Sequence, residues 1–222
     1  MNKRTLAVFL SAALLWGCGH DNSVTTNVPE HSDVVDMHPA PLTADTHFFA
    51  GQLAETQGNI PTAIGQYQLA LKLNPNHANS LFRLAVIYTE QKQFDQAIDT
   101  WQRYVHATKG SPESYANLGV CYELAGRPTD AQSAYEAGLQ KDSLSVVCRT
   151  NYGLMLARQD KIPDAMRIWQ PVLTDAQCHY NLASVYELES RKLQAKLEYE
   201  KALQLDPKMG DAAARLAALD MN

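Results

Sequence analysis

The 222-residue sequence has few cysteines and little positive charge. Its four cysteines form no C-x-x-C pair, so it lacks the usual pattern of a zinc site or a dithiol redox centre and is no disulfide-built miniature fold. Lysine and arginine total 19 against 24 aspartate and glutamate residues, a net charge of −5. No basic stripe is present, so we expect no binding to nucleic acid.

Sequence motifs of the common catalytic and metal sites are also missing. The chain contains no G-x-S-x-G, no H-E-x-x-H, no phosphate-binding glycine loop and no calcium loop. We therefore expect no enzyme activity, no cofactor, no metal ion and no small-molecule substrate. The hydrophobic fraction of 45% is high enough for a folded domain.

The first 17 residues have the features of an export signal. Two basic residues precede the apolar run LAVFLSAALL, which is shorter than the about 20 residues that cross a bilayer. The following LWGC resembles the lipobox of bacterial lipoproteins. That resemblance implies a signal peptide at 1–17 and a lipid on Cys18. Because Gly19 follows this cysteine, the resemblance also implies an anchor in the outer membrane that faces the periplasm. The alternative is a plain secretory signal with an incidental cysteine.

Residues 18–43 differ in composition from the rest of the chain. They are rich in Asn, Ser, Thr, Asp, His and Pro and show neither a helical nor a strand period. We interpret this segment, which begins with the lipidated cysteine, as a disordered tether. Its histidines and acids have no fixed geometry, so no metal site is expected there.

From residue 44 onward the sequence repeats. An alanine recurs at intervals of 34, 34, 34 and 30 residues, with an aromatic residue four positions after it and a glycine or alanine twelve positions before it. The alanines are Ala63, Ala97, Ala131, Ala165 and Ala195; the aromatics are Tyr67, Trp101, Tyr135, Trp169 and Tyr199; the small residues are Gly51, Ala85, Gly119, Gly153 and Ala183. This pattern resembles the tetratricopeptide repeat, whose period is about 34 residues.

The resemblance implies an all-α fold. We expect a right-handed superhelical solenoid of about five tetratricopeptide helix pairs with a C-terminal capping helix. The domain is predicted at 44–222, with repeats at 44–77, 78–111, 112–145, 146–175 and 176–209 and the cap at 210–220. The fourth repeat is four residues short, and its second helix meets Pro171, so that helix should end or kink early.

In such a solenoid the first helices line the inner wall, so residues that contact a ligand should recur at fixed positions of these helices. The sixth residue of repeats three, four and five is asparagine: Asn117, Asn151 and Asn181. An amide both donates and accepts, so it can pair with the backbone of an extended peptide. The pattern resembles the asparagine ladder of some peptide-binding members of the family, although asparagine also occurs there without a ligand.

The other positions predicted on this inner face are mostly apolar: Phe82, Val120, Leu154, Tyr180 and Ser184. No basic pair is present among them to hold a carboxylate. The surface therefore favours a protein partner that presents an apolar, mildly polar or basic peptide segment.

Three cysteines would remain after lipidation, which raises the alternative of a disulfide or a reactive thiol. Two of them occupy equivalent positions of successive first helices. Packed helix axes lie about 8–10 Å apart, whereas a disulfide needs Cα atoms within about 7 Å. We therefore expect small buried core residues at Cys121, Cys148 and Cys178.

Aromatic and histidine side chains offer further alternatives. An aromatic ligand box is conceivable at Trp101, Trp169 and Tyr199, but their helical spacing favours core packing. The helix-end or surface histidines are expected to cap helices or to be solvated: His77, His106 and His179.

Residues 116–173 resemble the tetratricopeptide lipoproteins of tight-adherence (Tad-type) pilus systems. This resemblance implies a non-enzymatic scaffold that binds a protein partner, in pilus or secretion-system assembly. A general envelope adaptor that docks cell-wall hydrolases or proteases is the alternative, and an enzyme or redox protein is disfavoured.

Overall fold

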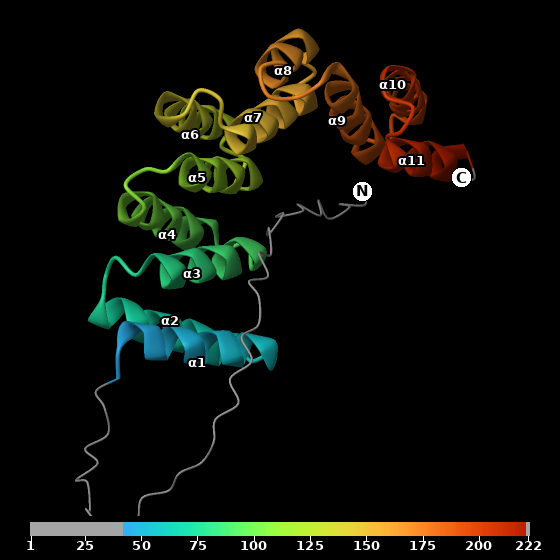
Figure 1. The fold of residues 1–222 in the computed structure, drawn as a ribbon. Coiled ribbons are helices and arrows are strands. Elements are labelled where there is room, and N and C mark those ends of the chain that lie inside the picture. Colours follow the sequence, from blue (N-terminus) through green and yellow to red (C-terminus); the bar gives the residue numbers. More distant parts are fainter. Residues whose placement is uncertain (1–41, 221–222) are drawn as a thin grey trace, which may run out of the picture. The chain divides into compact units, whose positions relative to one another are not determined.

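The computed structural model describes residues 42–220, in which every regular element is an α-helix (Figure 1). The helices are α1 (Ala44–Thr56), α2 (Ile60–Leu73), α3 (Ala78–Glu90), α4 (Phe94–Ala107), α5 (Pro112–Leu124), α6 (Pro128–Lys141), α7 (Val146–Arg158), α8 (Ile162–Trp169), α9 (Asp175–Leu188), α10 (Lys192–Leu205) and α11 (Gly210–Asp220). None of these helices is both long enough and apolar enough to cross a membrane. The predicted signal peptide, Cys18 and nearly all of the predicted tether lie outside the described residues.

Consecutive helices pack as five pairs, α1–α2, α3–α4, α5–α6, α7–α8 and α9–α10, and α11 packs against α10. In Figure 1 these pairs follow one another in chain order. Ala212 and Leu219 of α11 are buried, so the helix covers the apolar end of the last pair. The predicted all-α solenoid of five helix pairs with a C-terminal cap is confirmed.

A left-handed residue joins the two helices of each pair. Gly58 and Gly126 have φ of 72° and 73°, and the equivalent residues of the other pairs are Lys92, Asp160 and Ser190, with φ of 59°, 60° and 62°. In the first pair the Gly58 N–H donates to the Glu55 carbonyl at 2.9 Å. Such a reversal satisfies carbonyls that the end of the helix would otherwise leave unpaired.

Small residues on the first helices allow the aromatic residues of the second helices to pack closely. A Cβ atom placed on Gly51 or on Gly119 would lie 2.5 Å from Cε1 of Tyr67 or of Tyr135, respectively. The aromatic side chains at this position are buried in all five pairs. Trp101, Trp169 and Tyr199 are therefore core residues, as predicted, and form no ligand box.

The fourth pair departs from the others. Its second helix α8 ends at Trp169, two residues before Pro171, and has 8 residues where α6 has 14. The Arg149 guanidinium donates to the Ile168 carbonyl at 2.9 Å and to the Ser143 carbonyl at 2.6 Å, which caps the early end of α8. The other second helices pack against the following helix, but α8 makes no comparable contact with α9; α7 contacts α9 directly, as α5 contacts α7.

Candidate partner-binding surface

The three predicted asparagines occupy the same position of successive first helices. Asn117 lies on α5, Asn151 on α7 and Asn181 on α9, and α7 contacts both α5 and α9. Each is half-buried. Within residues 42–220 none of their amides has a protein hydrogen-bond partner, and no buried side-chain nitrogen or oxygen is left unsatisfied. Solvent therefore reaches these amides, and they are available to a ligand.

A pocket of about 380 Å³ opens beside the last of these asparagines, and we call it the α9 pocket. It is lined by side chains of α7, α9 and α11 and of the connections between them: Thr150, Leu173, Gln177, Tyr180, Asn181, Met209 and Asp211. The pocket brings together Tyr180 and Asn181, two of the residues predicted on the inner face. The other six predicted residues do not line it. A pocket of this size accommodates a few side chains of a peptide.

The lining of the α9 pocket combines an apolar wall with polar groups. Leu173, Met209 and the Tyr180 ring supply the apolar surface, and the Tyr180 ring packs at 5.6 Å from the ring of Tyr199. Asp211 is the one charged residue of the lining and is exposed. A negative charge at the rim favours a neutral or basic segment over an acidic one.

The region after short α8 contributes to this pocket. α8 ends at Trp169, and the connection to α9, residues 170–174, supplies Leu173 to the lining, whereas α8 itself supplies no residue. The four-residue deletion is visible in the sequence, but its effect on the surface is not. Thr150, Gln177, Met209 and Asp211 were not predicted, because their proximity depends on how the shortened pair stacks.

The remaining predicted residues have packing roles that the sequence does not reveal. The Phe82 ring packs edge-on against Trp101, with centroids 5.5 Å apart, and against Tyr104. Val120 and Leu154 are half-buried against the core. The Ser184 hydroxyl donates to the Tyr180 carbonyl at 3.0 Å. These residues are partly exposed, so a partner could still contact them.

Polar triads connect successive repeats. The Tyr67 hydroxyl donates to the Glu55 carboxylate at 2.6 Å, and Arg83 of the next repeat donates twice to the same carboxylate at 2.8 and 2.9 Å. Burial, followed by the hydrogen bond to Glu55, raises the pKa of Tyr67 well above its ordinary value. Equivalent triads are Tyr135–Glu123–Arg158 and Tyr199–Glu187–Arg215. These carboxylates are engaged, so we assign the triads to stability.

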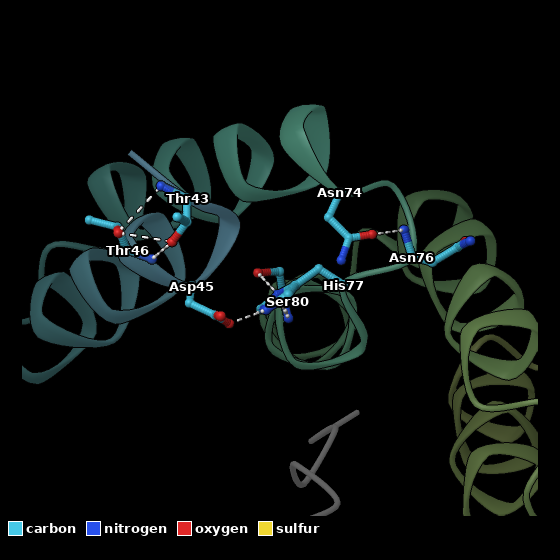
Figure 2. A network of polar contacts seen from close by, with 7 residues as sticks. All are labelled: Thr43, Asp45, Thr46, Asn74, Asn76, His77 and Ser80. Atoms are coloured by element: carbon cyan, nitrogen blue, oxygen red, sulfur yellow. Dashed lines mark hydrogen bonds and ion pairs between the residues drawn. The ribbon is translucent and has the colours of Figure 1, made fainter. Parts of the chain in front are cut away.

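Figure 2 shows His77 at the centre of a polar network between α1 and α3. Nδ1 of His77 accepts from the Ser80 N–H at 3.3 Å, and Nε2 lies 2.9 Å from the Asp45 carboxylate. His77 thus caps α3, as predicted. His179 is not simply solvated, because its Nδ1 lies 2.6 Å from the buried carboxylate of Glu198.

The three cysteines of the domain are buried, which confirms their prediction as core residues. Cys121, Cys148 and Cys178 are free thiols, each about 1% exposed or less. Burial raises the pKa of Cys178 to about 11 and also raises the pKa values of the other two thiols. A buried thiol with a raised pKa is a poor nucleophile, so these residues offer no reactive centre.

Several known proteins are similar in sequence to part of this chain. The photosystem I assembly protein Ycf3 of Prochlorococcus marinus (strain MIT 9303) is 31% identical over 103 residues, 45% of this chain and 57% of the relative. The general transcriptional corepressor ssn6 of Schizosaccharomyces pombe is 29% identical over 118 residues, 53% of this chain and 10% of that protein. The chain spans about half the length of the Ycf3 relatives that it matches.

Solved structures share the fold at low sequence identity. TTC0263, a thermophilic TPR protein of Thermus thermophilus, has a TM-score of 0.55 and 20% identity and covers 81% of this chain and 100% of its own. YrrB, a TPR protein with an unusual peptide-binding site, has a TM-score of 0.53 and 18% identity, with coverages of 78% and 91%. Pseudomonas aeruginosa pilF has a TM-score of 0.54 and 17% identity, with coverages of 79% and 82%.

Family models place the repeats in the same part of the chain as the helix pairs. Tetratricopeptide repeat models match residues 48–112, 90–146 and 176–209, which together make up more than half of the sequence. The alanine, aromatic and small positions of the repeat lie at the helix crossings, where the fold requires them. The chain belongs to the tetratricopeptide repeat family.

Proposed function

We propose that this chain is a non-enzymatic, lipid-anchored scaffold of the outer membrane, which binds a protein partner through its first helices during assembly of a pilus or secretion machine. As a tetratricopeptide repeat protein it is a protein-interaction module. The observation that carries the proposal is the α9 pocket, in which an unpartnered amide, an aromatic ring and an apolar wall converge.

The form of the bound partner follows from the chemistry of this surface. Asn117, Asn151 and Asn181 present amides that can pair with a peptide backbone, and the α9 pocket can take an apolar side chain. The acidic Asp211 disfavours an acidic segment at this point. We therefore propose an extended, neutral or basic peptide segment as the bound element.

The location rests on the lipobox-like LWGC that ends at Cys18. Each methylene group of an acyl chain that is buried in the membrane contributes about 0.8 kcal/mol of binding free energy. Several chains on one cysteine would therefore hold the domain durably at a membrane. An assembly role is supported by the resemblance of residues 116–173 to pilus lipoproteins and by sequence relatives that are themselves named assembly proteins.

The experiment compares the full chain with its Cys18→Ala variant, using Asn22→Ala as the matched control. Cells are fractionated and crosslinked, and the neighbours of the chain are identified by mass spectrometry. We expect the wild type and the control in the outer-membrane fraction, crosslinked to secretin, pilin-export or motor components, and the Cys18 variant displaced from it. Cell-wall hydrolases or proteases as neighbours would instead make the chain an envelope adaptor, and a membrane location unaffected by Cys18→Ala would refute the lipid anchor.

A further inference from the structure

A second pocket, of about 620 Å³, lies on the edge where second helices connect to the following first helices, and we call it the basic pocket. Its lining comes from the α2–α3 and α4–α5 connections and from α4, α5 and α6: Asn76, Gln102, Val105, His106, Ala107, Lys109, Gly110, Tyr115 and Lys141. Figure 1 shows that the two connections follow one another along the same edge of the stacked helices. The α9 pocket shares no residue with it.

The charge of the basic pocket is opposite to that of the whole chain. Lys109, Lys141 and His106 line it, whereas no carboxylate does. Within residues 42–220 none of these three side chains forms an ion pair, although arginines elsewhere in the domain, such as Arg127 and Arg158, do. In a chain of net charge −5, two lysine cations without an internal ion-pair partner therefore lie beside a histidine in one pocket.

The backbone at Gly110 lies close to the stem of Lys141 and to the Tyr115 ring. Gly110 is buried with φ of 70°, and a Cβ atom there would lie 3.1 Å from the Tyr115 ring and 3.4 Å from Cε of Lys141. Because Gly110 has no side chain, the Tyr115 ring and the Lys141 stem can both pack close to its main chain. Lys109 also has a positive φ, of 56°, which a lysine adopts only at a conformational cost.

We propose that the basic pocket binds the carboxylate side chains of an acidic peptide segment, at a site separate from the first-helix surface. Lys109 and Lys141 supply the positive charge, the Tyr115 hydroxyl can donate a hydrogen bond, and Val105 with Ala107 offers apolar contact. Anionic membranes are recognised by clusters of about four to eight basic residues. Two lysines and a histidine suit a short acidic segment better than a lipid surface.

This proposal does not depend on the function proposed above. The α9 pocket bears Asp211 and favours a neutral or basic segment, whereas the basic pocket favours an acidic one. A partner with segments of both kinds, or two partners, could be held at the same time. Variants at the lysines therefore test the basic pocket alone.

The test uses a fluorescently labelled, end-capped peptide of sequence Ser-Glu-Asp-Leu-Glu-Asp-Ser and its Gln/Asn analogue, titrated with the full chain while anisotropy is recorded. Lys109→Gly removes a charge and at the same time relieves the unfavourable φ, so the fold should be retained. Lys92→Gly is the matched control, because Lys92 also has a positive φ, of 59°, but does not line the pocket. Lys141→Gln removes the second charge.

We expect the acidic peptide to bind more tightly than its amide analogue, and more weakly as salt is added. The Lys109→Gly/Lys141→Gln double variant should lose about three- to tenfold in affinity, as expected for two exposed charge pairs, and Lys92→Gly should behave as wild type. Equal binding of both peptides, or unchanged affinity of the double variant, would overturn the proposal. Competition by inorganic phosphate or by phosphatidylglycerol vesicles at lower concentrations than the peptide would overturn it in favour of a phosphate ligand.

Discussion

The Tyr135 hydroxyl donates a 2.6 Å hydrogen bond to the carboxylate of Glu123, across the helix pair α5–α6. Arg158 of the following repeat donates to the same carboxylate at 2.5 Å. In pairs where the aromatic residue is tryptophan, the position of the glutamate is Thr89 or Ala157 instead. The partner therefore changes together with the aromatic residue: in the second pair the indole N–H of Trp101 donates to the Thr89 hydroxyl at 3.1 Å.

Loss of the Glu123 carboxylate should lower the stability of the domain. Glu123→Ala leaves the Tyr135 hydroxyl and the Arg158 guanidinium without their shared acceptor, so the free energy of unfolding should fall by about 1–3 kcal/mol. Glu200→Ala, at an exposed position of α10, is the control and should change stability by less than about 0.5 kcal/mol. Urea unfolding followed by circular dichroism measures both. Equal effects would mean that the triad adds nothing to stability.

Gly119 should tolerate no larger side chain. A Cβ atom there would lie 2.5 Å from Cε1 of Tyr135, so Gly119→Leu forces α5 and α6 apart and should lower stability by about 1–3 kcal/mol. Gly65 is a helical glycine of α2 at which an added Cβ would meet no atom within 4 Å, so Gly65→Ala should stabilise by about 0.4–1 kcal/mol. Thermal melts distinguish the two, and a native-like Gly119→Leu protein would contradict the helix crossing described above.

Substitutions at two of the left-handed turn residues should change stability in opposite directions. Gly126 has φ of 73° and no neighbouring atom within 4 Å of a Cβ, so Gly126→Ala should destabilise by about 1–2 kcal/mol through the backbone alone. Ser190 has φ of 62° without glycine, so Ser190→Gly should raise the melting temperature. If both substitutions shifted the melting temperature in the same direction, the turn geometry would be wrong.

Stability should decline in alkaline solution. Burial raises the pKa of Cys178 from its ordinary value of 9.0 to about 11, so the folded protein keeps a proton that the unfolded chain loses. This contribution is fully present below about pH 9 and is lost as the pH rises through about 11. Urea unfolding of wild type and Cys178→Ala across this range isolates the thiol, because buried tyrosines such as Tyr135 act in the same direction in both proteins. Parallel pH curves would contradict the pKa shift.

The same burial governs thiol reactivity. In the native domain Cys121, Cys148 and Cys178 should react with a thiol reagent only on unfolding, because each is buried and its thiolate is disfavoured. Rapid labelling of any of them in the native protein, measured by mass spectrometry, would reopen the possibility of a redox role.

Much of the helical architecture was predictable, because each repeat carries its own local signals. The alanine, the aromatic residue and the small residue fix where two helices cross, and Pro171 predicts the early end of α8. These signals act over distances of one helix pair. They are therefore visible in the sequence without knowledge of the neighbouring repeat.

The polar contacts and pockets were less predictable, because they join residues of different helices, 19 to 35 positions apart, through the packing itself. The interactions of Arg158 with Glu123 and of His179 with Glu198 have no short spacing rule. Capping of α8 by Arg149 likewise depends on where the shortened helix ends. Asn181 was identified from its recurring position, but the pocket beside it forms where side chains of α7, α9 and α11 and of their connections come together.

The most direct test of partner binding through the first helices is site-specific photo-crosslinking in cells. A photoreactive amino acid replaces Asn181 at the α9 pocket or, as the control, Glu200 on the exposed side of α10. The account predicts a discrete crosslinked partner from position 181 that is absent from position 200 and reduced when Asn117 and Asn151 are changed to alanine. The same partner captured equally from both positions, or none from position 181, would contradict it.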